Sequence, residues 1–205
     1  MIASKNSILC ICWLIATISL ANISENPAIQ KATKCCLDGD YDQAITEYKR
    51  FLFFHPDHPQ KSLVNLQMGK VFIQLADFES AIDLLQGAFQ RTSDVAQKLQ
   101  IGLQLIPVLI AENQTDRAVI VCDQVLTQLD QTSANVNSAD RARIYFFLGI
   151  SELYRQNWKV AKSAFLASDL VSLEVITLLD ESGQKDVNKS ASIAKWLSTF
   201  CPGLG

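Results

Sequence analysis

Residues 66–89 read Leu66-Gln-Met-Gly-Lys-Val-Phe-Ile-Gln-Leu-Ala-Asp77-Phe-Glu-Ser-Ala-Ile-Asp-Leu-Leu-Gln-Gly-Ala-Phe89, and this stretch decides the fold. Apolar residues recur at helical spacing on both sides of Asp77, which predicts two short helices folded back on each other. Asp77 lies at the corner, where we expect its side chain to cap the second helix. Gly69 and Ala81 are small enough to let the two helix backbones approach closely.

The same corner recurs three more times along the chain. It is found at residues 39–45 (Gly-Asp-Tyr-Asp-Gln-Ala-Ile), 116–119 (Asp-Arg-Ala-Val) and 158–161 (Trp-Lys-Val-Ala). The corner alanines are Ala44, Ala81, Ala118 and Ala161, separated by 37, 37 and 43 residues. A recurring unit of this length indicates stacked helix pairs.

This pattern resembles the tetratricopeptide repeat (TPR), a helix–turn–helix unit of about 34 residues. The slots of that family are filled here by Met68-Gly69, Phe72, Phe78, Ala81, Leu85 and Ala88. The sequence departs from the family pattern at four positions. Asn65 and Ser93 stand where the family has tryptophan and proline, Lys31 occupies an apolar slot, and Glu152 occupies an aromatic one. The resemblance covers roughly residues 28–170.

The resemblance implies an all-α fold, an α-solenoid of about four helix pairs. We expect the pairs at residues 28–55, 62–92, 96–130 and 139–170, with Pro107 kinking a helix of the third. A helix over 171–182 would cap the array, so that the repeat domain spans 28–182. Either Ser138 or Asp140 is expected to cap the first helix of the fourth pair.

Both ends of the chain differ from the repeats. A signal peptide is predicted over residues 1–21 from three features: Lys5, an apolar run from Ile8 to Leu20, and small residues before Asn22. An uncleaved anchor and a buried helix are the alternatives. Residues 183–205 read as a linker and an apolar segment, which is either the truncated start of a membrane domain or a frayed C-terminus.

Composition narrows the class of protein. The chain has 205 residues, 49% of them hydrophobic and 19% charged, with eight glycines, which argues against disorder. The net charge of −3 gives no electrostatic reason to expect nucleic-acid binding.

No pattern of catalytic residues, cofactor site or metal site emerges from the sequence. A Gly-rich phosphate loop, a Gly-x-Ser-x-Gly elbow and a Cys-x-x-Cys pair are all missing. His55 and His58 belong to a proline-rich turn rather than to a ligand set. Cys35, Cys36 and Cys122 read as small core residues, which is in mild tension with export.

Several other side chains are expected to have structural rather than functional roles. The apolar run from Phe51 to Phe54 is interpreted as packing against the next pair. The carboxylates of Glu47, Asp83 and Asp123 are expected on solvated outer helix faces.

In the TPR fold the first helix of each pair lines a concave groove, and we expect this groove to bind a partner. It is predicted to be mostly apolar, which suits an apolar or amphipathic protein segment, although the chain's own terminal segment is an alternative occupant. The predicted groove residues are Leu63, Leu66, Lys70, Ile73, Gln74, Leu103, Ile110, Phe146, Ile150 and Tyr154.

The sequence therefore predicts a non-catalytic protein-interaction scaffold, exported to the periplasm or cell envelope of a bacterium. The alternative is a membrane-tethered array whose missing C-terminal domain carries the function. An enzyme is the third and least favoured class.

Overall fold

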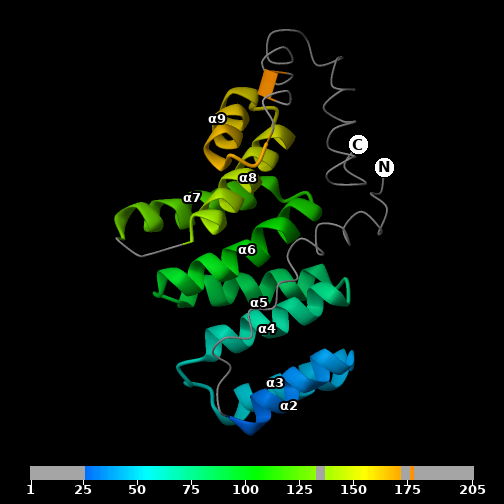
Figure 1. The fold of residues 1–205 in the computed structure, drawn as a ribbon. Helices are drawn as coiled ribbons and strands as arrows, with labels where there is room; N and C mark the ends of the chain where they lie inside the picture. The colour runs from blue at the N-terminus through cyan, green and yellow to red at the C-terminus, as the bar shows by residue number, and fades with distance from the viewer. Residues whose placement is uncertain (1–25, 133–136, 172–175, 178–205) are drawn as a thin grey trace. The chain divides into compact units, whose positions relative to one another are not determined.

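The computed structural model describes residues 26–132, 137–171 and 176–177, and all regular structure in these residues is helical (Figure 1). The signal peptide expected at 1–21, most of the capping helix expected at 171–182 and the segment 183–205 lie outside the described residues. No helix in the described part of the chain has both the length and the hydropathy needed to cross a membrane.

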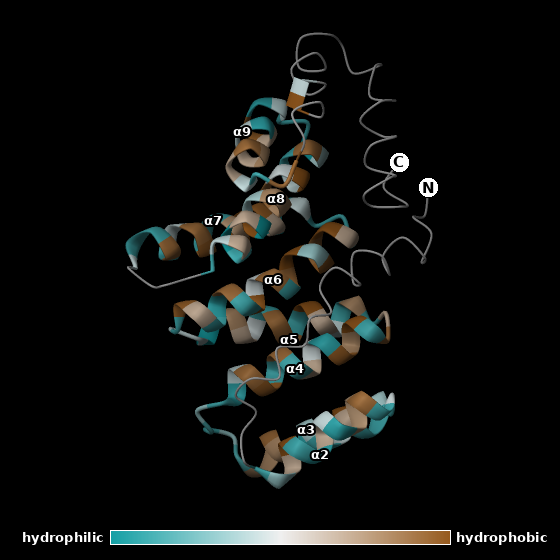
Figure 2. Cartoon of the chain, viewed as in Figure 1, coloured by the Kyte–Doolittle hydropathy of each residue, from teal (hydrophilic) through white to brown (hydrophobic). Residues whose placement is uncertain are grey.

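The described helices occur in the four predicted pairs, with boundaries close to those expected. They are α2 (Pro27–Asp38) with α3 (Tyr41–Phe54), α4 (Lys61–Gln74) with α5 (Phe78–Arg91), α6 (Val95–Ala111) with α7 (Thr115–Gln131), and α8 (Ser138–Tyr154) with α9 (Trp158–Ser168). Apolar and polar residues alternate around most of these helices (Figure 2), as helices that bury only part of their surface require. The all-α solenoid class is thus confirmed.

The chain divides into two compact units, and the division falls between Val108 and Leu109 inside α6. Pro107 lies within the helix, one residue before Val108. Proline interrupts the hydrogen bonding of a helix interior, because it has no N–H to donate. Each unit is therefore described separately.

The unit that ends at Val108 has its first core between α2, α3 and α4. It consists of Ile29, Ala32, Cys35, Ala44, Ile45, Tyr48, Phe51, Val64, Met68 and Val71. Tyr48 and Phe51 are each only 1% exposed. Because α4 contributes three of these residues, the second pair packs on the first through the same core that holds the first pair together.

In the unit that begins at Leu109, α8 and α9 are held together by an aromatic contact. The rings of Phe146 and Phe165 lie 5.9 Å apart, and Phe165 is completely buried. Gly149 faces Phe165 across the helix pair and has no room for a side chain, because an added Cβ would lie 2.6 Å from the ring. In the other unit Gly69 faces Leu85 in the same way, which confirms the close approach predicted there.

The four corners share one backbone conformation. Gly39, Ala76, Asn113 and Gln156 have positive φ angles of 80°, 57°, 58° and 59°. At each corner the next N–H donates to a carbonyl five residues earlier: Asp40 to Cys35, Asp77 to Phe72, Gln114 to Leu109 and Asn157 to Glu152, at 2.8–2.9 Å. This is the Schellman arrangement that closes a helix on a left-handed residue.

Capping of the second helices begins at the same corners. The carboxylate of Asp77 accepts a hydrogen bond from the N–H of Ser80 at 3.2 Å, as predicted, and Asp40 does the same for Gln43. The cap expected at Ser138 or Asp140 is wrong. Asn137 caps α8, accepting from Ala139 N–H at 3.1 Å, because the helix already begins at Ser138.

Candidate functional site

The predicted groove residues of α4 divide into buried and accessible ones. Leu66 and Ile73 are 2% and 8% exposed, so their side chains belong to the protein interior. Leu63 and Lys70 are half-buried and Gln74 is exposed. These three are spaced seven and four residues apart and therefore lie on one side of the helix. Burial lowers the pKa of the Lys70 ammonium, so its charge sits in a partly desolvated position.

The remaining predicted residues divide in the same way. Leu103, Ile110 and Ile150 are buried, whereas Phe146 and Tyr154 of α8 are half-buried. Half of the predicted set is therefore packed inside the protein. The accessible half consists of a stripe on α4 (Leu63, Lys70 and Gln74) and a pair on α8 (Phe146 and Tyr154), and for these a groove role stays a prediction.

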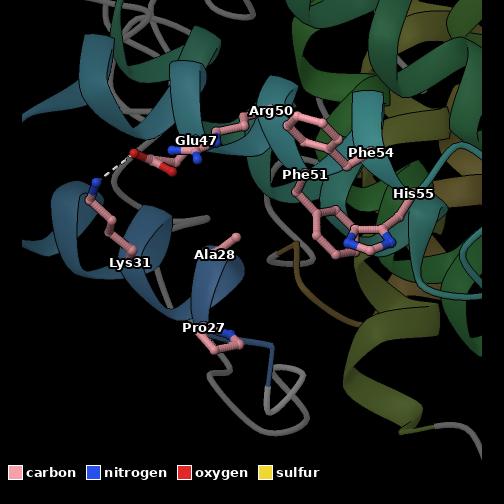
Figure 3. Close-up of a pocket in the computed structure, with 8 residues that line it drawn as sticks. All are labelled: Pro27, Ala28, Lys31, Glu47, Arg50, Phe51, Phe54 and His55. Carbon is pink, nitrogen blue, oxygen red and sulfur yellow. Dashed lines mark hydrogen bonds and ion pairs between the residues drawn. The ribbon is translucent and has the colours of Figure 1, made fainter.

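A second site, which the sequence did not predict, lies between α2 and α3. It is a pocket of about 270 Å³ lined by Pro27, Ala28, Lys31, Glu47, Arg50, Phe51, Phe54 and His55. Figure 3 shows the α2 side chains on one side and those of α3 on the other, with a dashed line joining Lys31 to Glu47. The ammonium of Lys31 donates to the Glu47 carboxylate at 2.6 Å.

The placement of Glu47 corrects the prediction that its carboxylate is solvated on an outer face. Glu47 is only 7% exposed, whereas Asp83 and Asp123 are exposed as expected. The hydrogen bond from Lys31 lowers the pKa of Glu47, because it stabilises the charged form more than burial destabilises it. A buried carboxylate needs such a partner.

Comparison of the first two pairs explains why this face of the first pair is polar. Thirty-seven residues after Lys31 and Glu47, the equivalent positions of the second pair hold Met68 and Leu84. Both pack against the core of the first pair. In the first pair the same face is a pocket instead, which explains Lys31 in a slot that the TPR family fills with an apolar residue.

Two aromatic side chains, one lining this pocket and one next to it, are exposed. Phe53 and Phe54 are 79% and 64% exposed, and their rings lie 5.3 Å apart at right angles. The interpretation that the whole run packs against the next pair is therefore wrong for these two, although Phe51 is buried. His55 and His58 each lie 5.0 Å from the Phe51 ring and so cover it at the end of α3.

A third group of charged residues lies in the unit that begins at Leu109. Glu152, 3% exposed, accepts from Arg155 at 2.8 Å, and Arg155 also bonds to Asp116 at 2.9 Å. Partial burial and the nearby charge of Glu152 raise the pKa of Asp123. Arg155 thus compensates the carboxylate that occupies an aromatic slot of the repeat pattern.

The cysteines of the described residues form no disulfide among themselves. Cys35, Cys36 and Cys122 are free thiols, and burial raises the pKa of Cys36 and Cys122, which keeps both protonated. No three potential ligands among the described residues are placed to hold a metal ion.

The fold is similar to that of a solved repeat protein. A crystal structure described as a Podospora anserina kinesin light chain with nearly identical TPR-like repeats superposes with a TM-score of 0.56 and 14% sequence identity, covering 89% of each chain. No protein family profile and no curated protein matches the sequence. The structural similarity therefore establishes a TPR-like fold for this chain.

Proposed function

We propose that this protein is a non-catalytic interaction scaffold that binds a protein partner through the first helices of its repeats. The observation that carries the proposal is the stripe of Leu63, Lys70 and Gln74 on α4. A half-buried aliphatic residue, a partly desolvated ammonium and an exposed amide along one side of a helix suit a segment with apolar and hydrogen-bonding groups. Phe146 and Tyr154 add accessible aromatic rings on α8.

The fold supports this proposal because it leaves part of the surface of the first helices unpacked. In a solenoid the stacked second helices and interior positions supply the packing, and the remaining surface of the first helices is left for recognition. An apolar or amphipathic partner segment, laid on such a surface, would bury its apolar side chains. We further propose that the scaffold works in a bacterial cell envelope, on the basis of the signal-peptide pattern in residues 1–21.

Site-specific photo-crosslinking in cells tests the scaffold. A benzophenone amino acid replaces Gln74 or Tyr154 in two variants and Asp83, an exposed residue of α5, in a third matched control. We expect crosslinks to one protein from the first two positions and none from the third. Crosslinks from Asp83 alone would place the binding surface on the second helices and contradict the proposal.

A further inference from the structure

We propose that the pocket between α2 and α3 is a second interaction site, which binds a helix of a protein partner that carries an acidic residue beside an apolar one. None of the residues that line it belongs to α4 or α8. Its ligand class follows from three features of the first pair. They are a face whose equivalent in the second pair is packed by helices, a cation that makes no hydrogen bond or ion pair among the described residues, and an exposed aromatic surface.

The kind of partner follows from the equivalence of the two pairs. In the second pair, the face that contains Met68 and Leu84 is packed against α2 and α3, that is, against helices. The equivalent face of the first pair holds Lys31, Glu47 and a pocket of about 270 Å³. Ligand pockets for whole small molecules usually exceed roughly 300 Å³. The pocket is therefore better suited to one or two side chains projecting from a helix.

The charge of the partner follows from Arg50. Lys31 and Glu47 neutralise each other at 2.6 Å. Arg50 lies near enough to lower the pKa of Glu47, but its guanidinium makes no hydrogen bond or ion pair within the described part of the chain. The pocket therefore carries one uncompensated positive charge. A guanidinium at a protein surface pairs best with a carboxylate, which it can hold through two hydrogen bonds.

The apolar component follows from Phe53 and Phe54, the two most exposed large hydrophobic residues described. Phe54 lines the pocket together with Ala28 and the buried Phe51, so an apolar side chain that enters the pocket would contact apolar carbon atoms. Exposed aromatic residues next to an arginine are typical of the residues that dominate binding energy at protein interfaces.

Two occupants from the chain itself fit less well. A second copy would present the same face with its own Arg50, so the two positive charges would repel each other. Residues 1–25 contain a single acidic residue, Glu25, directly before the first described residue, and their apolar run contains none. An acidic helix of another protein complements both the charge and the aromatic surface.

The test uses a phage-displayed library of 16-residue helical peptides, panned against the full chain. We expect enrichment of peptides that carry Asp or Glu three or four residues from Leu, Ile or Phe. Fluorescence anisotropy then measures the enriched peptides on variants. Arg50→Glu should weaken binding at least tenfold and Arg50→Gln somewhat less, with Phe54→Ala also weakening it. Lys49→Glu, the same charge change at the adjacent exposed position outside the pocket, should leave binding unchanged.

Four results of the peptide measurements would overturn the proposal. They are enrichment of peptides without acidic residues, no enrichment at all, equal loss from Lys49→Glu and Arg50→Glu, and peptide binding that appears only when residues 1–21 are removed. Sedimentation of the wild type and of Arg50→Glu tests the second copy, since a dimer that Arg50→Glu dissociates would also overturn it. Lys70→Glu should not alter peptide binding, so failure here is distinguishable from failure of the groove proposal.

Discussion

Gly149 on α8 lies directly against the ring of Phe165 on α9, so close that a Cβ on Gly149 would be 2.6 Å from Cε1 of that ring. Glycine is otherwise a poor choice inside a helix, because its backbone loses the most conformational freedom on folding. The position is therefore occupied by glycine for reasons of packing. The same relationship links Gly69 and Leu85, where the Cβ would lie 2.8 Å from the leucine side chain.

We expect Gly149→Ala to lower the free energy of unfolding by about 1–3 kcal/mol, since a methyl group must displace a fully buried ring. Urea denaturation would measure the change. Adding Phe165→Leu should recover part of the loss, so that the double variant is more stable than the sum of the single effects predicts. Additive effects would mean that the two residues are not in contact.

Gly87→Ala is the matched control for that experiment. A Cβ on Gly87 would approach only the guanidinium of Arg91, at 2.9 Å, and this flexible end of a side chain can move away. We expect no loss of stability and a gain of up to about 1 kcal/mol from the better helix propensity of alanine. A large loss here would show that the cost at Gly149 does not come from Phe165.

A second prediction concerns the equivalent corner positions Ala76 and Gly39. Exchanging alanine and glycine should change the melting temperature in opposite directions at the two positions. Ala76 and Gly39 both have left-handed backbones, which cost an L-residue about 1–2 kcal/mol but cost glycine little. We expect Ala76→Gly to raise the melting temperature and Gly39→Ala to lower it. Melting curves followed by circular dichroism would decide. A lower midpoint for Ala76→Gly would indicate that alanine is not strained at this corner.

Much of this fold could be predicted from the spacing of a few small residues. The pair expected at residues 62–92 forms α4 and α5 over 61–91, and Asp77 caps α5 as expected. Such features depend on residues close together in sequence, because a helix and its cap are local structures. The corners repeat for the same reason, since each needs only one residue that tolerates a positive φ.

The accessible surface was much harder to predict. Leu66 and Leu63 look equivalent in sequence, yet only Leu63 remains partly accessible, because a first helix contacts neighbours on more than one side. Apolar spacing identifies burial but not which neighbour causes it. The clue to the pocket was nevertheless present. Lys31 and Glu47 are both charged, whereas the equivalent residues of the second pair, Met68 and Leu84, are apolar. Because both charged residues occupy packing positions of the same helix pair, an ion pair between them could have been predicted.

Export is a prediction that the structure does not test. The pattern of Lys5, an apolar run and small residues predicts cleavage after Ala21, leaving Asn22 as the first residue of the mature protein. Mass spectrometry of the protein purified from its native cells would determine the N-terminus. An intact residue Met1 in the membrane fraction would show that the run serves as an anchor.

The thiol of Cys122 provides a probe of local opening. Cys122 is completely buried, and burial raises the pKa of its thiol, so the reactive thiolate is scarce and shielded in the folded protein. In a Cys35→Ala and Cys36→Ala background, labelling of Cys122 with iodoacetamide should be slow in native buffer and become fast in unfolding concentrations of urea. Cys10, Cys12 and Cys201, which lie outside the described residues, are replaced by serine so that they do not contribute. Fast labelling without urea would show that α7 opens readily.

The Lys31–Glu47 pair predicts a pH dependence of stability. The pKa of Glu47 is lowered from 4.5 in the folded protein, mainly by the hydrogen bond from Lys31. A group with a lowered folded pKa stabilises the fold above its unfolded pKa, and this contribution disappears as the pH falls through the folded value. The stability difference between wild type and Glu47→Gln should therefore be constant near neutral pH and shrink below pH 4.5. In a Lys31→Gln background the same substitution should show little pH dependence, because the hydrogen bond that lowers the pKa is gone. An undiminished pH dependence in that background would mean that another group, with Arg50 as the nearest candidate, holds the Glu47 carboxylate in its charged form.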